Sequence, residues 1–291
     1  MISFFWKIGI KNSISFIYCK LINGLFYRIS PMVKKQFDFL NQIKGNNYLI
    51  KYSFGIFQIK FTFNKKPLNL FLRGSSSDTS VFRQIFINKE YGFITKILPS
   101  VSDYKIIIVD IGANIGLVTA FFKCLYENPV IYCLEPEPEN FQQLKKNVNL
   151  NKFQNVSCYN YGIWDSETQL NFSFNFRDHQ SWAVQLYRDS NKEKNIIKVK
   201  TLNNVLSSIN VKVIDILKID IEGAEAKIFN DEENYDYLRR IKIILIEIHD
   251  EYDCRARINN ILERNNFLLS VEGEFTIGIK NAFLNKNNKS L

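Results

Sequence analysis

Runs of consecutive apolar, mostly β-branched residues recur from residue 105 onward and alternate with stretches of helical periodicity. Continuous apolar runs of this length are typical of strands that are buried on both faces of a sheet. The runs cover residues 106–109, 130–134, 156–161, 213–219 and 241–248, and the clearest helical stretches cover 137–150 and 224–237. Strands that alternate with helices predict a doubly wound, mostly parallel α/β sheet.

Two further strands are predicted after this alternation, at residues 267–271 and 275–279. Only a short turn separates them, which predicts an antiparallel hairpin that closes one edge of the sheet. Residues 170–186 interrupt the alternation with regularly spaced phenylalanines, and we expect an inserted strand or hairpin there.

The first part of the chain has a different pattern. Residues 48–72 alternate between polar and apolar, which predicts a hairpin or a small sheet with its turn near Pro67. Residues 75–78 look like a loop that ends at a helix N-cap, and residues 81–98 have helical spacing. Before them, apolar residues at helical spacing predict an amphipathic helix, at Ile10, Ile14, Ile17, Leu21 and Leu25.

These patterns divide the chain into three parts. We expect an N-terminal helical and β extension (1–71), a main α/β domain (72–284) and a disordered polar tail (285–291). The amphipathic helix can pack on the body of the protein or lie on an anionic membrane face. No uncharged run is long enough to span a bilayer, and no signal peptide is recognisable.

Charge and cysteine content narrow the classes of protein. The chain has 38 Lys and Arg against 29 Asp and Glu, a net charge of +9, which favours an anionic partner. Six of the basic residues precede the first acidic residue, Asp38, which shifts the expectation from nucleic acid towards anionic lipid or glycolipid. Five cysteines without CxxC spacing argue against a disulfide framework or zinc knuckle and fit a cytoplasmic protein, with peripheral contact at the inner face of a membrane.

The strongest chemical motif is the segment 110–116, which follows a predicted buried strand and opens a helix. Gly112 permits a tight turn with close approach of a ligand, and Gly116 lets the helix pack near the strand. Glu135, at the tip of the next strand, is placed to accept both hydroxyls of a ribose. Dinucleotide folds use G-x-G-x-x-G, whereas Asp110 here would repel a pyrophosphate and suit the amino group of a methionine moiety. The motif therefore favours S-adenosylmethionine (SAM) over NAD.

A second acidic motif closes the fourth predicted strand, at residues 218–225. Ligands of open α/β sheets bind at the carboxyl ends of strands, so Asp220 and Glu222 should face a ligand. The neighbouring strand ends with Glu247 and His249 on one side, and we expect Asp220, Glu222 and His249 to converge on one pocket. Asp220 and Glu222 could also hold a divalent cation such as Mg²⁺ or Mn²⁺.

Three segments together resemble the FkbM-type methyltransferases, a branch of the class I SAM-dependent family: 110–116, 218–225 and 247–249. Residues 73–78, 81–82 and 90–91 resemble the family's upstream segment. The resemblance implies a seven-stranded sheet and O-methyl transfer from SAM to a hydroxyl of a sugar, glycan or glycolipid. His249 would be the general base, with Glu222 or Asp220 as rivals or orienting groups. The residues expected to bind the cofactor are Asp110, Gly112, Ala113, Asn114, Gly116, Glu135, Pro136, Asp165, Ser77 and Asp78.

Four alternative functions remain open from the sequence, and one of them is a methyltransferase that acts on another small molecule. A nucleic-acid methyltransferase is disfavoured, because the chain lacks the Asn/Asp-Pro-Pro-aromatic and Pro-Cys motifs and its basic residues are scattered. A non-catalytic SAM-fold scaffold at a membrane and an NAD-dependent oxidoreductase are the others. The acceptor pocket is expected to come from residues 1–71 and 170–186, whose patterns do not identify the acceptor.

Overall fold

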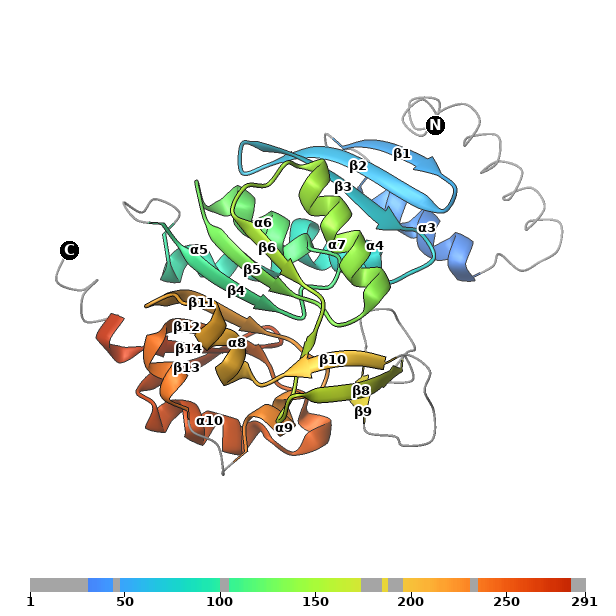
Figure 1. The fold of residues 1–291 in the computed structure, drawn as a ribbon. Helices are drawn as coiled ribbons and strands as arrows, with labels where there is room; N and C mark the ends of the chain where they lie inside the picture. Colours follow the sequence, from blue (N-terminus) through green and yellow to red (C-terminus); the bar gives the residue numbers. More distant parts are fainter. Residues whose placement is uncertain are drawn as a thin grey trace.

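The computed structural model describes residues 31–43, 48–99, 105–173, 185–187, 196–230 and 235–283. The predicted helix between Ile10 and Leu25 and the predicted tail 285–291 lie outside these described residues, as does part of the predicted insertion. Figure 1 shows a central twisted sheet with helices on both faces, a smaller sheet built from the N-terminal segment, and a third sheet at the opposite side. No helix of the described segments is long and apolar enough to cross a membrane.

The central sheet has seven strands, and all neighbouring pairs are parallel except those that involve β14. This confirms the predicted doubly wound sheet and its antiparallel C-terminal hairpin. In spatial order the strands are β13 (Phe267–Glu272), β14 (Phe275–Lys280), β12 (Ile241–Glu247), β11 (Ile214–Ile219), β4 (Ile107–Ile111), β5 (Val130–Leu134) and β6 (Val156–Tyr159).

Both faces of this sheet are buried because successive residues of each strand belong to different hydrophobic cores. Ile108 and Ile216 pack into one core, whereas Val109 and Leu217 pack into the other. Helices α6 (Leu117–Leu125) and α7 (Pro138–Leu150) contribute to the first core, and α8 (Leu202–Ser208) and α10 (Arg255–Arg264) contribute to the second. The continuous apolar runs in the sequence reflect this two-sided burial.

The N-terminal segment forms α3 (Pro31–Gln42) and an antiparallel sheet of β1 (Leu49–Ser53), β2 (Ile56–Phe63) and β3 (Lys66–Arg73). The turn between β2 and β3 is at Asn64 and Lys65, which both have positive φ, so the prediction of a turn near Pro67 was wrong. Pro67 instead lies within β3, at the edge of the sheet where a missing N–H is tolerated. The predicted domain boundary at residues 71/72 falls inside β3, and residues on both sides of it share one hydrophobic core.

Helix α7 completes the free edge of β3 with side-chain amides instead of a fourth strand. The Asn147 side chain accepts from the Phe71 backbone N–H at 2.8 Å and donates to the Phe71 carbonyl at 3.2 Å. Asn151 makes the same pair of hydrogen bonds with Asn69, at 2.8 and 2.7 Å. Gln143, one turn earlier on α7, also donates to the Phe71 carbonyl. These bonds fix the N-terminal sheet on the helix that follows β5.

Two predicted helices are shorter than their periodicity suggested. Residues 81–98 form α4 (Asp78–Phe82), a π-helical turn, a 3₁₀ turn and α5 (Ile94–Ile97). Residues 224–237 contain only α9 (Glu225–Ile228) and the start of a 3₁₀ turn in the part that the structure describes. The predicted insertion is confirmed in its described part, where a third sheet has the order β7 (Gly162–Ile163), β10 (Ile196–Lys200), β8 (Thr168–Ser173) and β9 (Gln185–Tyr187).

Candidate active site

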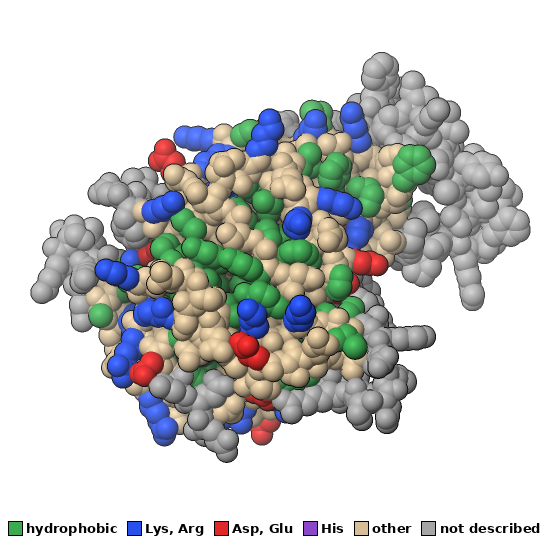
Figure 2. Space-filling view, viewed as in Figure 1, with side chains coloured by type: hydrophobic (Ala, Val, Ile, Leu, Met, Phe, Trp, Pro, Cys, Tyr) green, Lys and Arg blue, Asp and Glu red, His purple; other side chains and the backbone are tan. Residues whose placement is uncertain are grey.

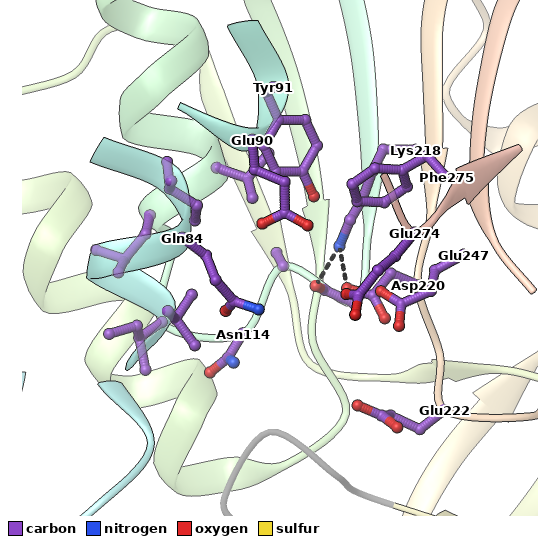
Figure 3. A pocket seen from close by; sticks show the side chains of 17 residues that line it. Gln84, Glu90, Tyr91, Asn114, Lys218, Asp220, Glu222, Glu247, Glu274 and Phe275 are labelled. Atoms are coloured by element: carbon purple, nitrogen blue, oxygen red, sulfur yellow. Dashed lines mark hydrogen bonds and ion pairs between the residues drawn. The ribbon is translucent and has the colours of Figure 1, made fainter. Parts of the chain in front are cut away.

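Two cavities meet at the carboxyl ends of the central strands. Gly112, Asn114, Asp220 and Glu222 line both of them. The first, which we call the acidic cavity, has a volume of about 360 Å³ and is shown in Figure 3. Its polar side chains are Gln84, Glu90, Tyr91, Asn114, Lys218, Asp220, Glu222, Glu247 and Glu274. The second, which we call the Glu135 cavity, also contacts Pro136, Tyr161 and Ile163.

The loop between β4 and α6 divides the two cavities, and its glycines are required by its geometry. Gly112 has φ +76°, and a Cβ atom there would lie 1.8 Å from the backbone oxygen of Asp220. Gly116 has φ +83°, and a Cβ would approach the Leu144 side chain to 2.6 Å. Asn114 also lies in the left-handed region, at φ 49°, which turns its backbone N–H towards Glu135. The motif forms the tight turn that the sequence predicts. The turn brings the backbone of Gly112 against the backbone of Asp220, the residue directly after β11.

Glu135 is a buried carboxyl group at the wall of the second cavity, with a residue exposure of 4%. One oxygen accepts from the Asn114 N–H at 2.7 Å and the other from the Glu137 N–H at 2.9 Å. Burial raises the pKa of Glu135 to about 7, although these two N–H groups lower it. The Asn160 amide donates to the backbone oxygens of Glu135 and Pro136, which holds this strand end in place.

Asp110 is fully buried and does not line either cavity, and its predicted contact with a ligand amino group stays a prediction. Its carboxylate accepts from the Thr119 hydroxyl at 3.0 Å and lies 3.6 Å from the Lys218 ammonium. Lys218 also lies 3.2 Å from Asp220 and donates to the Gly112 carbonyl at 2.8 Å. Burial alone lowers the pKa of Lys218, but the charges of Asp220 and Asp110 outweigh burial and leave it raised.

His249 lies beside Glu222 as expected, and three carboxyl groups surround its imidazole ring. Its Nδ1 is 3.2 Å from Glu225, and its Nε2 is 3.3 Å from Glu222 and 3.7 Å from Glu247. Burial lowers the pKa of His249, yet hydrogen bonds to Glu222 and Glu225 outweigh burial and raise it to about 11. A protonated imidazole has no lone pair with which to accept a proton. The raised pKa therefore favours a protonated His249 that is held between carboxylates, and its predicted role as a general base stays a prediction.

Glu225 is a buried carboxylate that fixes the position of the His249 ring. Its carboxylate is fully buried and accepts from the backbone N–H groups of Ile221 and Gly223 at 2.9 and 2.8 Å. The same carboxylate contacts His249 and thus ties the strand end to the turn after β11. The ligand atoms of Asp220, Glu222 and His249 all lie within 4.8 Å of one another, as the predicted metal site requires.

Besides Asp110, four predicted cofactor residues lie away from the cavity walls: Gly116, Ser77, Asp78 and Asp165. Ser77 and Asp78 are buried, and Asp78 pairs with Arg73 at 2.9 Å instead of closing a ligand site. Asp165 lines neither cavity, and one of its oxygens accepts from the Ser166 hydroxyl. Ala113 does line the acidic cavity and Pro136 the Glu135 cavity.

Both walls of the acidic cavity contain side chains to which the sequence assigned no role. Glu90 and Tyr91 come from the 3₁₀ turn before α5, whereas Glu274, from the β13–β14 turn, and Phe275, at the start of β14, lie on the side of Lys218 and Asp220 (Figure 3). Burial, together with the charges of Glu274 and Asp220, raises the pKa of Glu90 to about 7. The resemblance of residues 90–91 to the family's upstream segment was the available signal for Glu90 and Tyr91, and no motif marked Glu274.

We predict that the unliganded protein loses stability as the pH rises from 5 to 9. Burial, with Asp220 as the next cause, raises the pKa of Glu247 to about 9, while Glu90 and Glu135 rise to about 7 from 4.5. His249 rises from 6.5 to about 11. The folded state therefore binds more protons than the unfolded chain in this window, and each stabilising contribution is lost as the pH climbs through the folded-state value. Thermal melts at five pH values test this; a midpoint that rises with pH would contradict it, and Glu247→Gln should flatten the slope.

The chain is similar in sequence to a family of methyltransferases and to two fungal proteins. The family model "Methyltransferase FkbM domain" matches residues 110–269, more than half of the chain. Methyltransferase 1 of Beauveria bassiana is 26% identical over 212 residues, which cover 66% of this chain and 82% of that protein. Methyltransferase sdnD of Sordaria araneosa is 25% identical over 218 residues, with coverages of 64% and 81%.

Among solved structures, a methyltransferase FkbM from Methylobacillus flagellatus KT is similar at a TM-score of 0.40 and 16% identity. The match covers 62% of this chain and 45% of that one. The match to the family model over β4 to β13 includes both the glycine loop and the acidic strand end of β11. The chain therefore belongs to the FkbM methyltransferase family.

Proposed function

We propose that the protein is a SAM-dependent O-methyltransferase that acts on a hydroxyl group of a sugar, glycan or glycolipid. The observation that carries this proposal is the pair of cavities that meet at Gly112, Asn114, Asp220 and Glu222. One cavity can hold a nucleoside while the other admits an acceptor. When bound, SAM supplies a methyl carbon that its sulfonium group activates for transfer.

The residues of the Glu135 cavity fit the cofactor. The Glu135 carboxylate faces this cavity with its orientation fixed by two backbone N–H groups, as the recognition of ribose hydroxyls requires. The backbone at Gly112 offers a surface without a side chain, since a Cβ there would collide with β11. Ala113, Asn114 and Pro136 complete the proposed contacts at the cavity walls.

The remaining chain groups would align the acceptor and take its proton. Methyl transfer is an in-line displacement, so positioning of the acceptor oxygen is the main task of the protein. Of the three candidates for the base, Asp220 is the most accessible, with 28% of its side chain exposed and its carboxylate held by Lys218. We propose that Asp220 receives the hydroxyl proton while protonated His249 fixes Glu222. A divalent cation is not part of this proposal.

Replacing Glu135 by glutamine should weaken SAM binding about 10- to 100-fold. The loss corresponds to about 1–3 kcal/mol, the effect of removing a buried charged hydrogen-bond partner. Isothermal titration calorimetry of the wild type and the variant measures it. Glu139→Gln is the matched control, because the Glu139 side chain is 85% exposed on the same segment. Absence of SAM binding by the wild type would overturn the proposed function, and unchanged affinity of the variant would overturn the role of Glu135.

The acceptor class is tested by transfer of labelled methyl from SAM. Cell-envelope glycolipids, soluble glycans, small molecules and nucleic acids are incubated as separate fractions with the full chain. We expect label in a hydroxylated glycan or glycolipid fraction and none in nucleic acid. Basic side chains are spread over the face seen in Figure 2 rather than gathered in one groove, and the acidic cavity would repel phosphates. Label confined to nucleic acid would refute this acceptor class.

Contact with an anionic membrane through the N-terminal segment is a further part of the proposal and implies a location at its cytoplasmic face. The segment carries basic residues ahead of Asp38, and most of them lie outside the described residues. The full chain should co-sediment with vesicles that contain phosphatidylglycerol. Substitution of Lys7, Lys11, Lys20 and Arg28 by glutamine should reduce binding several-fold. The matched control replaces four exposed lysines of the body, Lys51, Lys60, Lys65 and Lys89, and equal loss in both variants would contradict the proposal.

A further inference from the structure

The acidic cavity has an unusual balance of charged side chains. Among the described residues that line it, five are acidic and only Lys218 is basic. In Figure 3, Glu90 lies on one wall, and Asp220, Glu247 and Glu274 lie together on the other. Two cationic side chains, Lys218 and His249, lie next to this cluster. A ligand of this cavity therefore meets a crowd of carboxyl groups whose burial and mutual repulsion raise the pKa values of Glu90 and Glu247, so that a bound cation would favour their ionised forms.

Neither cation is available to a ligand. The Lys218 ammonium is 1% exposed and contacts Asp110, Asp220 and the Gly112 carbonyl. His249 is fully enclosed by Glu222, Glu225 and Glu247. These cations neutralise buried carboxylates beneath the cavity floor. Glu90 and Glu274 have no basic partner among the ion pairs of the described residues.

A second observation points to a ligand in this cavity. Tyr91 is 3% exposed, and its ring is held 5.0 Å from the ring of Phe275. Its hydroxyl is directed into the cavity between Glu90 and Lys218 (Figure 3). Within the described segments this hydroxyl has no hydrogen-bond partner. The rest of the side chain is buried, so the hydroxyl is the part of Tyr91 that faces the cavity, where it is placed to hydrogen-bond a ligand.

The polar groups of the cavity accept more hydrogen bonds than they donate. Ionised carboxylates only accept, and a protonated amine only donates, with three N–H groups. A neutral polyol needs donors as well, and the cavity offers few beyond the Gln84 and Asn114 amides and Tyr91. We propose that the acceptor carries a protonated amino group beside the hydroxyl that is methylated. This inference rests on the proposed function and names the acceptor class: an amino sugar or a similar amino alcohol.

The cofactor alone does not account for the charge of the cavity. SAM brings a sulfonium and an ammonium group but also a carboxylate, so its net charge is +1. Several acidic side chains remain unbalanced after that charge is counted. Burial and the repulsion from Glu274 and Asp220 raise the pKa of Glu90, and a bound cation relieves this repulsion. An acceptor with a phosphate or carboxylate group would increase it.

The same charges direct the methyl group to oxygen. A carboxylate cluster stabilises the protonated form of the acceptor amine. A protonated amine has no lone pair and cannot attack the methyl carbon. The hydroxyl oxygen, whose proton passes to a chain carboxylate, forms the new C–O bond as the C–S bond breaks. The sulfur keeps the electron pair of the broken bond.

Calorimetry on the full chain saturated with S-adenosylhomocysteine tests the inference. The probes are glucosamine, N-acetylglucosamine and glucose, which share a ring and differ in the charge at one position. Glucosamine should bind at least tenfold more tightly than either neutral sugar. Glu247→Gln and Glu274→Gln should remove most of this preference. Glu272→Gln, an exposed change on the same hairpin outside the cavity, should leave it intact.

The outcomes distinguish a failure of the proposed function from a failure of the inference about the acceptor. Failure of S-adenosylhomocysteine to bind overturns the proposed function. If it binds and glucose matches glucosamine, or if no amino sugar binds, the inference about the acceptor is overturned while the proposed function stands. A third outcome is that Mg²⁺ stabilises the wild type but not the two Gln variants, and that glucosamine is not preferred. The acidic side chains would then form a metal site, and the inference would also be overturned.

Discussion

Replacing Gly112 by alanine is expected to destabilise the protein by about 4 kcal/mol or more and to abolish cofactor binding in any folded fraction. The added Cβ would lie 1.8 Å from the Asp220 oxygen and 3.0 Å from its carbonyl carbon, both backbone atoms. Backbone atoms of two buried neighbouring strands cannot move apart without loss of their hydrogen bonds and packing. The φ of +76° adds strain for any residue other than glycine.

Two other glycines provide graded controls for this prediction. Gly273, in the β13–β14 turn, has φ +60° but open space around its Cβ position, so Gly273→Ala should cost only about 1 kcal/mol. Gly116→Ala should fall between the two, since the Cβ would meet a flexible leucine side chain. Urea unfolding of the three variants measures the series. Equal losses at Gly112 and Gly273 would show that the contact with Asp220 is unimportant.

Replacing Lys218 by methionine is expected to cost about 3–5 kcal/mol, because it leaves a buried carboxylate without its counterion. Asp110 is fully buried, and Lys218 is the cation beside it. Methionine retains most of the apolar stem but donates no hydrogen bond to the Gly112 carbonyl. The free energy of unfolding in urea gives the loss directly, and SAM binding should weaken with it because the glycine loop loses a tether.

The surface pair Asp236–Arg239 is the matched control, with side chains that are 60% and 79% exposed at 3.0 Å. Arg239→Met should change stability by no more than about 1 kcal/mol. The double variant Lys218→Met with Asp110→Asn should recover part of the loss, because the uncompensated charge is then absent. A double variant as unstable as the sum of its single changes would contradict this account of the pair.

Much of the fold was predictable because its signals are local. The apolar runs around Val109, Leu217 and Leu245 identify strands covered on both faces, and the glycine loop identifies the ligand end of the sheet. Helix boundaries were less accurate at residues 81–98, where tertiary contacts impose π and 3₁₀ turns on a helical pattern. The sequence predicted a turn at Pro67 because proline is common in turns. In the structure the turn lies at Asn64 and Lys65, which both adopt positive φ values.

The functional roles were less predictable because charge states depend on long-range burial. Asp110 and His249 carry the residue types of a ligand-binding acid and a general base. Lys218 neutralises the first, and Glu222 and Glu225 hold the second protonated. The spacing of the motifs correctly predicted that Asp220, Glu222 and His249 lie close together. It could not predict their protonation states. Glu274 reaches the cavity from the β13–β14 turn, and no local motif marks it.

The amide contacts between α7 and β3 have a consequence for how the protein behaves in a crowded solution. An edge strand with open N–H and C=O groups can pair with the edge of another copy and start aggregation. Asn147 and Asn151 occupy those groups at Phe71 and Asn69, so β3 offers no template for strand addition. A helix thereby closes the β3 edge of a sheet whose other edge is β1, and two asparagines one helical turn apart remove the β3 edge from intermolecular strand pairing.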